Sequence, residues 1–93
     1  MDHFNYRNGQ LYAEDVSVAE IAASVGTPFY VYSTATLVRH FKLFDDALDG
    51  LDHCICYAMK AASNQAILKT LGNLGAGMDV VSGGEYRRAI SAG

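Results

Sequence analysis

The chain has 93 residues, of which 51% are hydrophobic and 18% are charged, and its formal net charge is −3. This composition is typical of an ordered globular chain, and the acidic balance with scattered Lys and Arg residues argues against nucleic acid as a partner. No run approaches the roughly 18 to 20 apolar residues of a membrane span, and the N-terminal residues lack the layout of a signal peptide, so we expect a cytoplasmic protein without membrane contact.

Two local patterns stand at the beginning of the chain. Residues 4–12 mix aromatic and polar side chains around the pair Asn8-Gly9, which indicates a tight turn between two short strands. Residues 17–26 predict a helix, because Ser17 can cap its N-terminus and the apolar residues after it recur at helical spacing.

A short strand and a longer helix are predicted next. Residues 27–33 are rich in β-forming side chains, and Pro28 stands at the entry, where a missing N–H does least harm. Ser33 can cap the following helix, whose apolar side chains recur at helical spacing and should face a core. This face consists of Leu37, Phe41, Phe44 and Leu48.

Two strand–helix units follow. Residues 53–59 and 77–82 predict strands, and residues 63–75 and 83–93 predict the helices after them. Such units in series imply parallel strands joined by a helical crossover. Parallel sheets occur almost only with several strands and both faces covered, so we predict an α/β fold that is incomplete as it stands. The inward helix faces should contain Ile67, Leu68, Leu71 and Leu74, and then Tyr86, Ala89 and Ile90.

Lys60 stands at the end of an otherwise apolar strand. Alternation along that strand places it on the same face as the small residues Cys54, Cys56 and Ala58, which leave room beside it. A lysine is rarely buried unless it is paired. Three interpretations stay open, namely a solvated lysine, a buried ion pair with Asp79, and an amine that attacks a carbonyl to form a Schiff base.

The cysteines and histidines do not predict a metal site. Cys54 and Cys56 should lie about 6.5 to 7 Å apart on one side of a strand, which is too far for a disulfide. We therefore expect free thiols with a structural role in a reducing compartment. The three histidines, His3, His40 and His53, share no ligand spacing.

Two segments, YAMKAASNQAIL and GAGMDVVSGGEYRRA, resemble the fold-type III pyridoxal-phosphate-dependent decarboxylases. The family pattern has Tyr-Ala-x-Lys-Ala at a strand end and Gly-x-Asp-Val-x-Ser-x-Gly-Glu about one strand–helix unit later. The first part is matched by Tyr57, Ala58, Lys60 and Ala61, and the second by Gly77, Asp79, Val80, Ser82, Gly84 and Glu85. The pair Ala62-Ser63 departs from the asparagine that many members carry directly after Lys-Ala.

This resemblance implies the N-terminal part of a (β/α)8 barrel of the TIM type. Residues 31–93 would begin the barrel that binds pyridoxal phosphate, with its first two βα units, and residues 1–30 would belong with a β-domain. Members are several times longer and work as homodimers with active sites at the subunit interface. We therefore expect the complete protein to dimerise, and residues 1–93 alone to be inactive and poorly stable.

The resemblance also implies roles for four residues. Lys60 would hold pyridoxal phosphate as a Schiff base, and Lys60 and Asp79 would act in catalysis. Ala58, Asp79 and Glu85 would contact the cofactor, which would take up the electrons left by CO2 loss. Glu85 and Ser82 also have a simpler explanation, as an acidic first-turn residue and an N-cap of a helix.

The substrate class follows from the same resemblance. The fuller match of the segment DVVSGGE favours members that convert the amino acid meso-2,6-diaminopimelate to L-lysine. Decarboxylases of the same fold that act on ornithine, arginine or carboxynorspermidine are alternatives. A pyridoxal-phosphate-binding protein without catalysis and a purely structural piece are alternatives of a different class.

Overall fold

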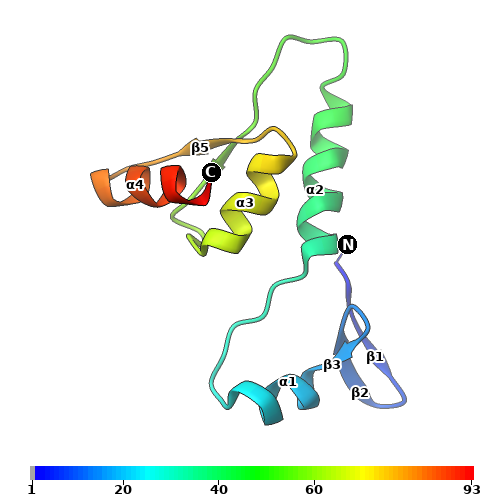
Figure 1. Cartoon of the computed structure of the whole chain (residues 1–93). Coiled ribbons are helices and arrows are strands. Elements are labelled where there is room, and N and C mark those ends of the chain that lie inside the picture. The colour runs from blue at the N-terminus through cyan, green and yellow to red at the C-terminus, as the bar shows by residue number, and fades with distance from the viewer. Residues whose placement is uncertain (1) are drawn as a thin grey trace. The chain divides into compact units, whose positions relative to one another are not determined.

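The structure is a computed structural model that describes residues 2–93 (Figure 1). The chain divides into two compact units, one that ends at Thr36 and one formed by Leu37–Gly93. Each unit has its own small sheet. No helix among the described residues is both long and apolar enough to cross a bilayer.

The sheet of the N-terminal unit is antiparallel. Its strands are β1 (Phe4–Arg7), β2 (Gln10–Ala13) and β3 (Val16–Ser17), in that spatial order. The hairpin predicted around Asn8 and Gly9 is confirmed, since both residues have positive φ, 52° and 79°, and join β1 to β2. The third strand was not predicted, because two residues carry no alternation that a sequence pattern could reveal.

The first helix, α1 (Val18–Val25), begins and ends as predicted. Ser17 Oγ accepts a hydrogen bond from the backbone N–H of Glu20 at 3.0 Å, so it caps the N-terminus. At the other end, the N–H of Gly26 donates to the carbonyl of Ala22 at 2.9 Å, and Gly26 has a φ of 81°. A glycine adopts this left-handed backbone without steric cost.

The strand predicted for residues 27–33 is wrong. This segment contains no strand, and Tyr30 within it is 91% exposed. A strand needs a neighbour for its N–H and C=O groups, and none of residues 2–93 pairs with this segment. Helix α2 (Thr34–Ala47) follows, and Ser33 caps it as predicted, accepting from the N–H of Thr36 at 3.1 Å.

The apolar face of α2 is not buried as predicted. Leu37 and Phe41 are half-buried, Phe44 is 56% exposed, and no residue of the helix is fully buried. Helical spacing indicates which side of a helix is apolar, but it carries no information about what lies against that side. The helix ends at Ala47 and is followed by a turn through Gly50, whose φ is 87°.

The second unit contains the two predicted βα units. Its elements are β4 (Cys56–Ala58), α3 (Gln65–Asn73), β5 (Gly77–Asp79) and α4 (Gly83–Ala92). The two strands are parallel, so the α/β class and the helical crossover are confirmed. Both strands are shorter than predicted, because the regular pairing between them spans three residues on each side.

The core of this unit lies between the sheet and α3. Its buried side chains are Met59, Ile67, Leu68 and Leu71, each no more than 6% exposed. The inward face predicted for α3 is thus confirmed for Ile67, Leu68 and Leu71, whereas Leu74 is half-buried at the C-cap. Asn64 caps the start of the helix by accepting from the N–H of Ala66 at 2.8 Å. The face predicted for α4 is not buried, since Tyr86 and Ile90 are 59% and 63% exposed. Both line an open groove of about 640 Å³ together with side chains of α3 and β5.

Candidate active site

Lys60 lies in a tight turn directly after β4. The N–H of Ala61 donates to the carbonyl of Ala58 at 3.1 Å, so Met59 and Lys60 are the two central residues of the turn. Lys60 is exposed, which agrees with the interpretation of a solvated lysine, and its role in a Schiff base stays a prediction. The lysine is exposed because β4 ends at Ala58, two residues before it.

The backbone on both sides of Lys60 is fixed. Met59 is 1% exposed, and its N–H donates to the carbonyl of Asp79 on β5 at 3.3 Å. On the other side, the hydroxyl of Tyr57 donates to the carbonyl of Ala62 at 2.8 Å. The turn is therefore held by the core, by the neighbouring strand and by a side chain of β4.

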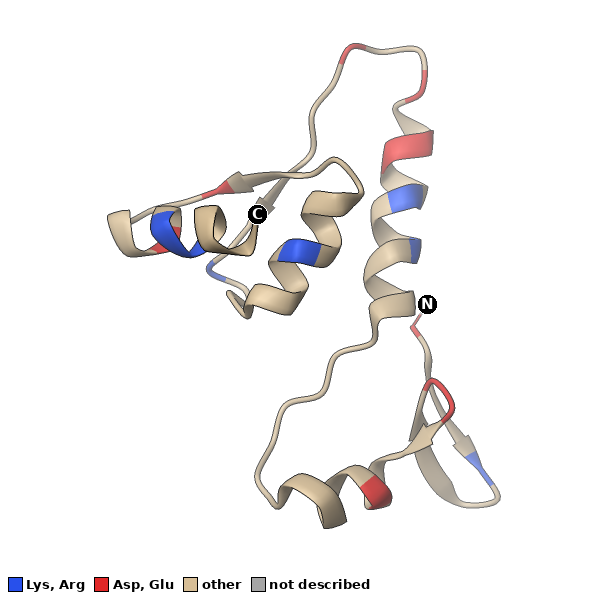
Figure 2. Cartoon of the chain, viewed as in Figure 1, with Lys and Arg blue, Asp and Glu red and all other residues tan. Residues whose placement is uncertain are grey.

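Asp79 lies beside the lysine turn. It is the register partner of Ala58, and paired residues of parallel strands point to the same side of a sheet. Asp79 is exposed and forms no ion pair with Lys60. The interpretation of Lys60 as a buried ion pair is therefore wrong for residues 2–93. The Lys and Arg residues are spread over β1, α2, α3, α4 and the turn after β4, so no basic patch stands out (Figure 2).

The two cysteines occupy the same face of the sheet, farther from Lys60. Their Sγ atoms are 3.9 Å apart, closer than predicted, because Cys54 precedes the regular strand. Both thiols are free, as predicted. The pKa of the Cys56 thiol is raised, chiefly by the hydrogen bond and charge of Cys54 and less by burial and the Asp79 carboxylate. Gly77 leaves the space that Cys56 needs, since a Cβ on this glycine would lie 3.0 Å from Cys56 Sγ.

Glu85 closes the turn between β5 and α4. Its Oε1 accepts from the N–H of Val81 at 2.8 Å, and its own N–H donates to Ser82 Oγ at 3.1 Å. Ser82 is thus the N-cap of α4, as predicted from the sequence. Both contacts of Glu85 are explained by its place in the first turn of α4, where it takes part in capping the helix. Its contact with the cofactor stays a prediction.

Glu14 is a polar centre that the sequence did not reveal. Its φ is 55°, in the left-handed region, and its carboxylate Oε2 accepts from Ser33 Oγ at 2.6 Å and from the N–H of Ala35 at 3.1 Å. These two bonds, that of Ser33 first, hold the pKa of the Glu14 carboxyl below its ordinary value. The only signal in the sequence was Ser33 as an expected N-cap.

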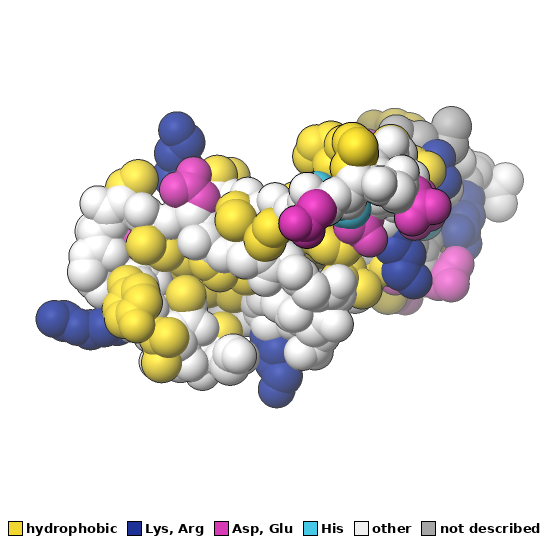
Figure 3. All heavy atoms as spheres, turned by 90° about the horizontal axis from the view of Figure 1, so that it is seen from above, with side chains coloured by type: hydrophobic (Ala, Val, Ile, Leu, Met, Phe, Trp, Pro, Cys, Tyr) yellow, Lys and Arg dark blue, Asp and Glu magenta, His cyan; other side chains and the backbone are white. Residues whose placement is uncertain are grey.

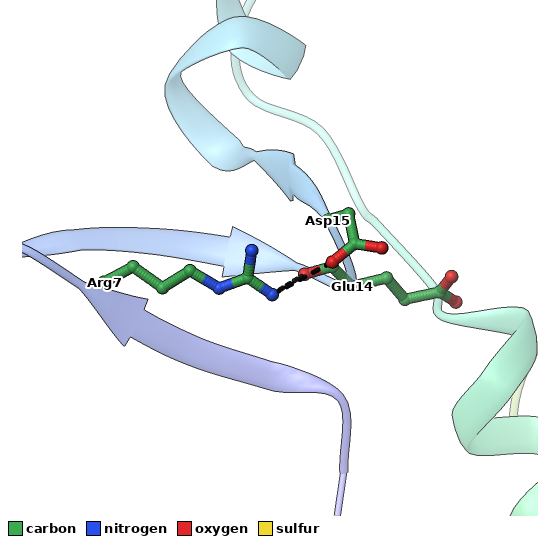
Figure 4. Close-up of polar contacts among 3 residues, drawn as sticks. All are labelled: Arg7, Glu14 and Asp15. Carbon is green, nitrogen blue, oxygen red and sulfur yellow. Dashed lines mark hydrogen bonds and ion pairs between the residues drawn. The ribbon is translucent and has the colours of Figure 1, made fainter.

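The backbone of Glu14 is engaged as well. Its N–H donates to the carbonyl of His3 at 2.7 Å, and its carbonyl accepts from Arg7 Nη2 at 2.9 Å. The same Arg7 nitrogen also pairs with Asp15 at 3.1 Å, while the Glu14 side chain points away from the arginine (Figure 4). Glu14 therefore ties the sheet of the N-terminal unit to the first turn of α2.

His53 is also more than an ordinary surface residue. Its Nε2 lies 2.6 Å from Asp45 Oδ1, and its Nδ1 lies 2.8 Å from the carbonyl of Leu51. The Leu51 carbonyl first and the Asp45 carboxylate second raise the pKa of the imidazole. His53 thus fastens the connection between α2 and β4. Residues 2–93 contain no cluster of three or more His, Cys, Asp or Glu side chains that could bind a metal.

The turn after β4 has the chemistry that pyridoxal phosphate requires. The cofactor's aldehyde needs a primary amine within reach, and Lys60 presents an exposed amine at a fixed place on the backbone. The neighbouring position on β4 is Ala58, whose side chain is small, and its register partner on β5 is the exposed Asp79. Lys60 and the small side chain of Ala58 are therefore suited to binding pyridoxal phosphate.

Comparisons with known proteins agree with this chemistry. Residues 34–93 match the family described as pyridoxal-dependent decarboxylase, pyridoxal binding domain. The whole chain is 52% identical to a diaminopimelate decarboxylase of Pseudomonas fluorescens and spans 22% of its length.

Solved structures have the same fold over nearly the whole chain. A crystal structure of a protein from Aquifex aeolicus matches 98% of the chain with a TM-score of 0.91 and 46% identity. A diaminopimelate decarboxylase from M. jannaschii, solved in complex with L-lysine, matches 98% of the chain with a TM-score of 0.83 and 32% identity. The chain spans 22% of each of these two structures. Because residues 34–93 match the model of this family, the chain belongs to the pyridoxal-dependent decarboxylases.

Proposed function

We propose that the protein carrying this chain decarboxylates meso-2,6-diaminopimelate to L-lysine with pyridoxal phosphate as cofactor. The observation that carries the proposal is the exposed amine of Lys60 in a turn held on both sides, within the residues that match the pyridoxal-dependent decarboxylase family. Support for the substrate comes from relatives that are about half identical over the whole chain and bear the name diaminopimelate decarboxylase. One relative of that name was solved with L-lysine, the expected product.

Four residues would form this chain's share of the site. Lys60 Nζ would hold the cofactor covalently, and Ala58 would leave room for it on the face of β4. Asp79, exposed on the same face, would balance positive charge near the lysine. Glu85 would contribute by holding the turn that follows β5. When bound, the cofactor supplies an electron sink for the electron pair left by the departing CO2.

The larger architecture is part of the same proposal. Residues 31–93 would form the first two βα units of a (β/α)8 barrel, and residues 1–30 would accompany a β-domain. The C-terminal end of β4, where Lys60 follows, is the end at which barrel enzymes place their active sites. We also propose a homodimer in the cytoplasm, and the free thiols of Cys54 and Cys56 suit that reducing compartment.

The direct test is to locate the covalent linkage. The complete protein, loaded with pyridoxal phosphate, is reduced with borohydride and digested, and the labelled peptide is identified by mass spectrometry. We expect the label on Lys60, and Lys60→Ala should lose both the label and at least about 10³-fold in kcat/KM. The matched control is Lys69→Arg, at an exposed lysine of α3, which should retain both.

The substrate is tested by CO2 release from meso-diaminopimelate, ornithine, arginine and carboxynorspermidine in parallel. Preference for one of the last three would overturn the substrate while leaving the cofactor chemistry intact. A label on another residue, or none at all, would overturn the assignment of Lys60.

A further inference from the structure

The turn that carries Lys60 is bridged by a side chain that the proposed chemistry does not use. Tyr57 and Lys60 are three residues apart, and the half-buried Tyr57 hydroxyl reaches over the turn to the carbonyl of Ala62 at 2.8 Å. The bond therefore joins the last part of β4 to the backbone beyond the lysine. It spans residues 57–62 and so encloses the turn, which is itself closed by the backbone hydrogen bond from Ala61 to Ala58.

We infer that Tyr57 is a positioning residue for Lys60, which fixes the place of the lysine by tying Ala62 to β4. This inference rests on the proposed function of Lys60. Alternation along β4 puts Tyr57 on the opposite side of the strand from Cys56 and Ala58, and so away from the face where the cofactor would bind. Tyr57 therefore acts through the backbone and does not touch the reacting atoms.

The other contacts of the turn fix the backbone before Lys60 but not the backbone after it. Met59 is held by the core and by the carbonyl of Asp79, so the chain entering the turn is fixed without Tyr57. The chain leaving the turn runs through exposed Ala61 and half-buried Ala62 and Ser63 before α3 begins, and none of these three is fully buried. A bond from Tyr57 to Ala62 restricts this exit segment, and an amine that must meet one aldehyde atom in one orientation gains from that restriction.

The decisive variant is Tyr57→Phe in the complete protein. It keeps the ring and removes the hydroxyl, so the turn loses one anchor and the fold stays. We expect the dissociation constant for pyridoxal phosphate to rise about three- to tenfold, the range for one net hydrogen bond. The pH at which the absorption band of the lysine-linked cofactor changes should also shift. Tyr6→Phe, at a 73% exposed tyrosine of β1, is the matched control and should change neither quantity.

A second variant guards against a general loss of folding. Ala62→Gly keeps the Tyr57 hydroxyl and loosens the backbone that it holds, so it should weaken cofactor binding in the same direction. Both variants are measured well below their melting temperatures. A lower melting temperature with an unchanged dissociation constant and pH midpoint in both would overturn the inference.

The two proposals fail in different ways. If the unchanged protein shows no label on Lys60, the proposed function fails. If Lys60 is labelled normally and neither variant changes the dissociation constant or the pH midpoint, only the role of Tyr57 fails.

Discussion

Glu14 shows how one residue can join three segments of a small unit. A non-glycine residue in the left-handed region costs about 1 to 2 kcal/mol, so its φ of 55° needs compensation. The residue makes four contacts through N–H, carbonyl and carboxylate, to His3, Arg7, Ser33 and Ala35. The strained backbone is thus the conformation from which all four partners can be reached.

The charge of Glu14 predicts an acid-sensitive helix start. Because its pKa is lower in the folded chain, the carboxylate stabilises the N-terminal unit at neutral pH. This contribution falls as the pH drops below the ordinary glutamate pKa, about 4.3, and is lost once the pH has fallen through the lowered value. We therefore compare amide hydrogen exchange at Ala35 and Thr36 in the unchanged protein and in a Glu14→Gln variant at each pH. The ratio of the rate in the unchanged protein to the rate in the variant should rise as the pH falls.

The Gln variant serves as the control because it keeps an acceptor oxygen but cannot titrate. Glu14→Ala should expose both amides at every pH. If the unchanged protein and Glu14→Gln had the same ratio of exchange rates from pH 7 to pH 3, the carboxylate would not carry the effect.

At the residue scale, the sequence predicted which residues lie at the strand ends better than it predicted their exposure and the distances between their side chains. Lys60 and Asp79 could be assigned to neighbouring strand ends, and the structure has Asp79 in register with Ala58. The sequence left open whether Lys60 is exposed or buried, because this depends on where β4 stops. The closeness of the Cys54 and Cys56 sulfurs depends on the same irregularity, since alternation holds only within a regular strand.

At the scale of elements, helix ends were predictable because their signals are local. Ser17, Ser33 and Ser82 each accept from the N–H of the residue three positions later, as their sequence positions indicated. Strands were less predictable because their partners lie elsewhere in the chain. The segment 27–33 has strand-like composition without a strand, and the two-residue β3 forms because β2 lies beside it.

The cap of α4 gives a test at this scale. Ser82→Ala removes the acceptor for the Glu85 N–H and should lower the free energy of unfolding of the complete protein by about 1 kcal/mol. Urea titration followed by circular dichroism measures this change. Ser91→Ala, at an exposed position near the other end of α4, is the control and should leave stability nearly unchanged. Equal effects of the two substitutions would contradict the capping role.

At the scale of the whole molecule, much apolar surface is open to solvent. Hydrophobic side chains lie at the surface over the part formed by β5 and α4, at the left of Figure 3. Soluble monomers rarely expose large contiguous apolar patches. The large hydrophobic residues that are at least 48% exposed are Tyr6, Val16, Val25, Tyr30, Tyr32, Leu43, Phe44, Leu51, Val81, Tyr86 and Ile90.

This exposure predicts the behaviour of residues 1–93 expressed alone. We expect the segment to bind a hydrophobic dye, to associate, to melt without a cooperative transition and to release no CO2 from any of the four amino acids. The complete protein, measured at equal molar concentration, is the control and should bind less dye per molecule. A sharp melt of a monomeric segment would contradict this expectation.

The turn after β4 also bears on which changes to the coding sequence can persist. Met59 is 1% exposed, and the very next residue, Lys60, is exposed. Insertion or loss of a single codon between Tyr57 and Met59 would shift both residues by one position relative to β4, which would move the lysine toward the core or the methionine toward solvent. Replacing one small residue by another leaves that order intact. This stretch is therefore constrained in length more strictly than in composition.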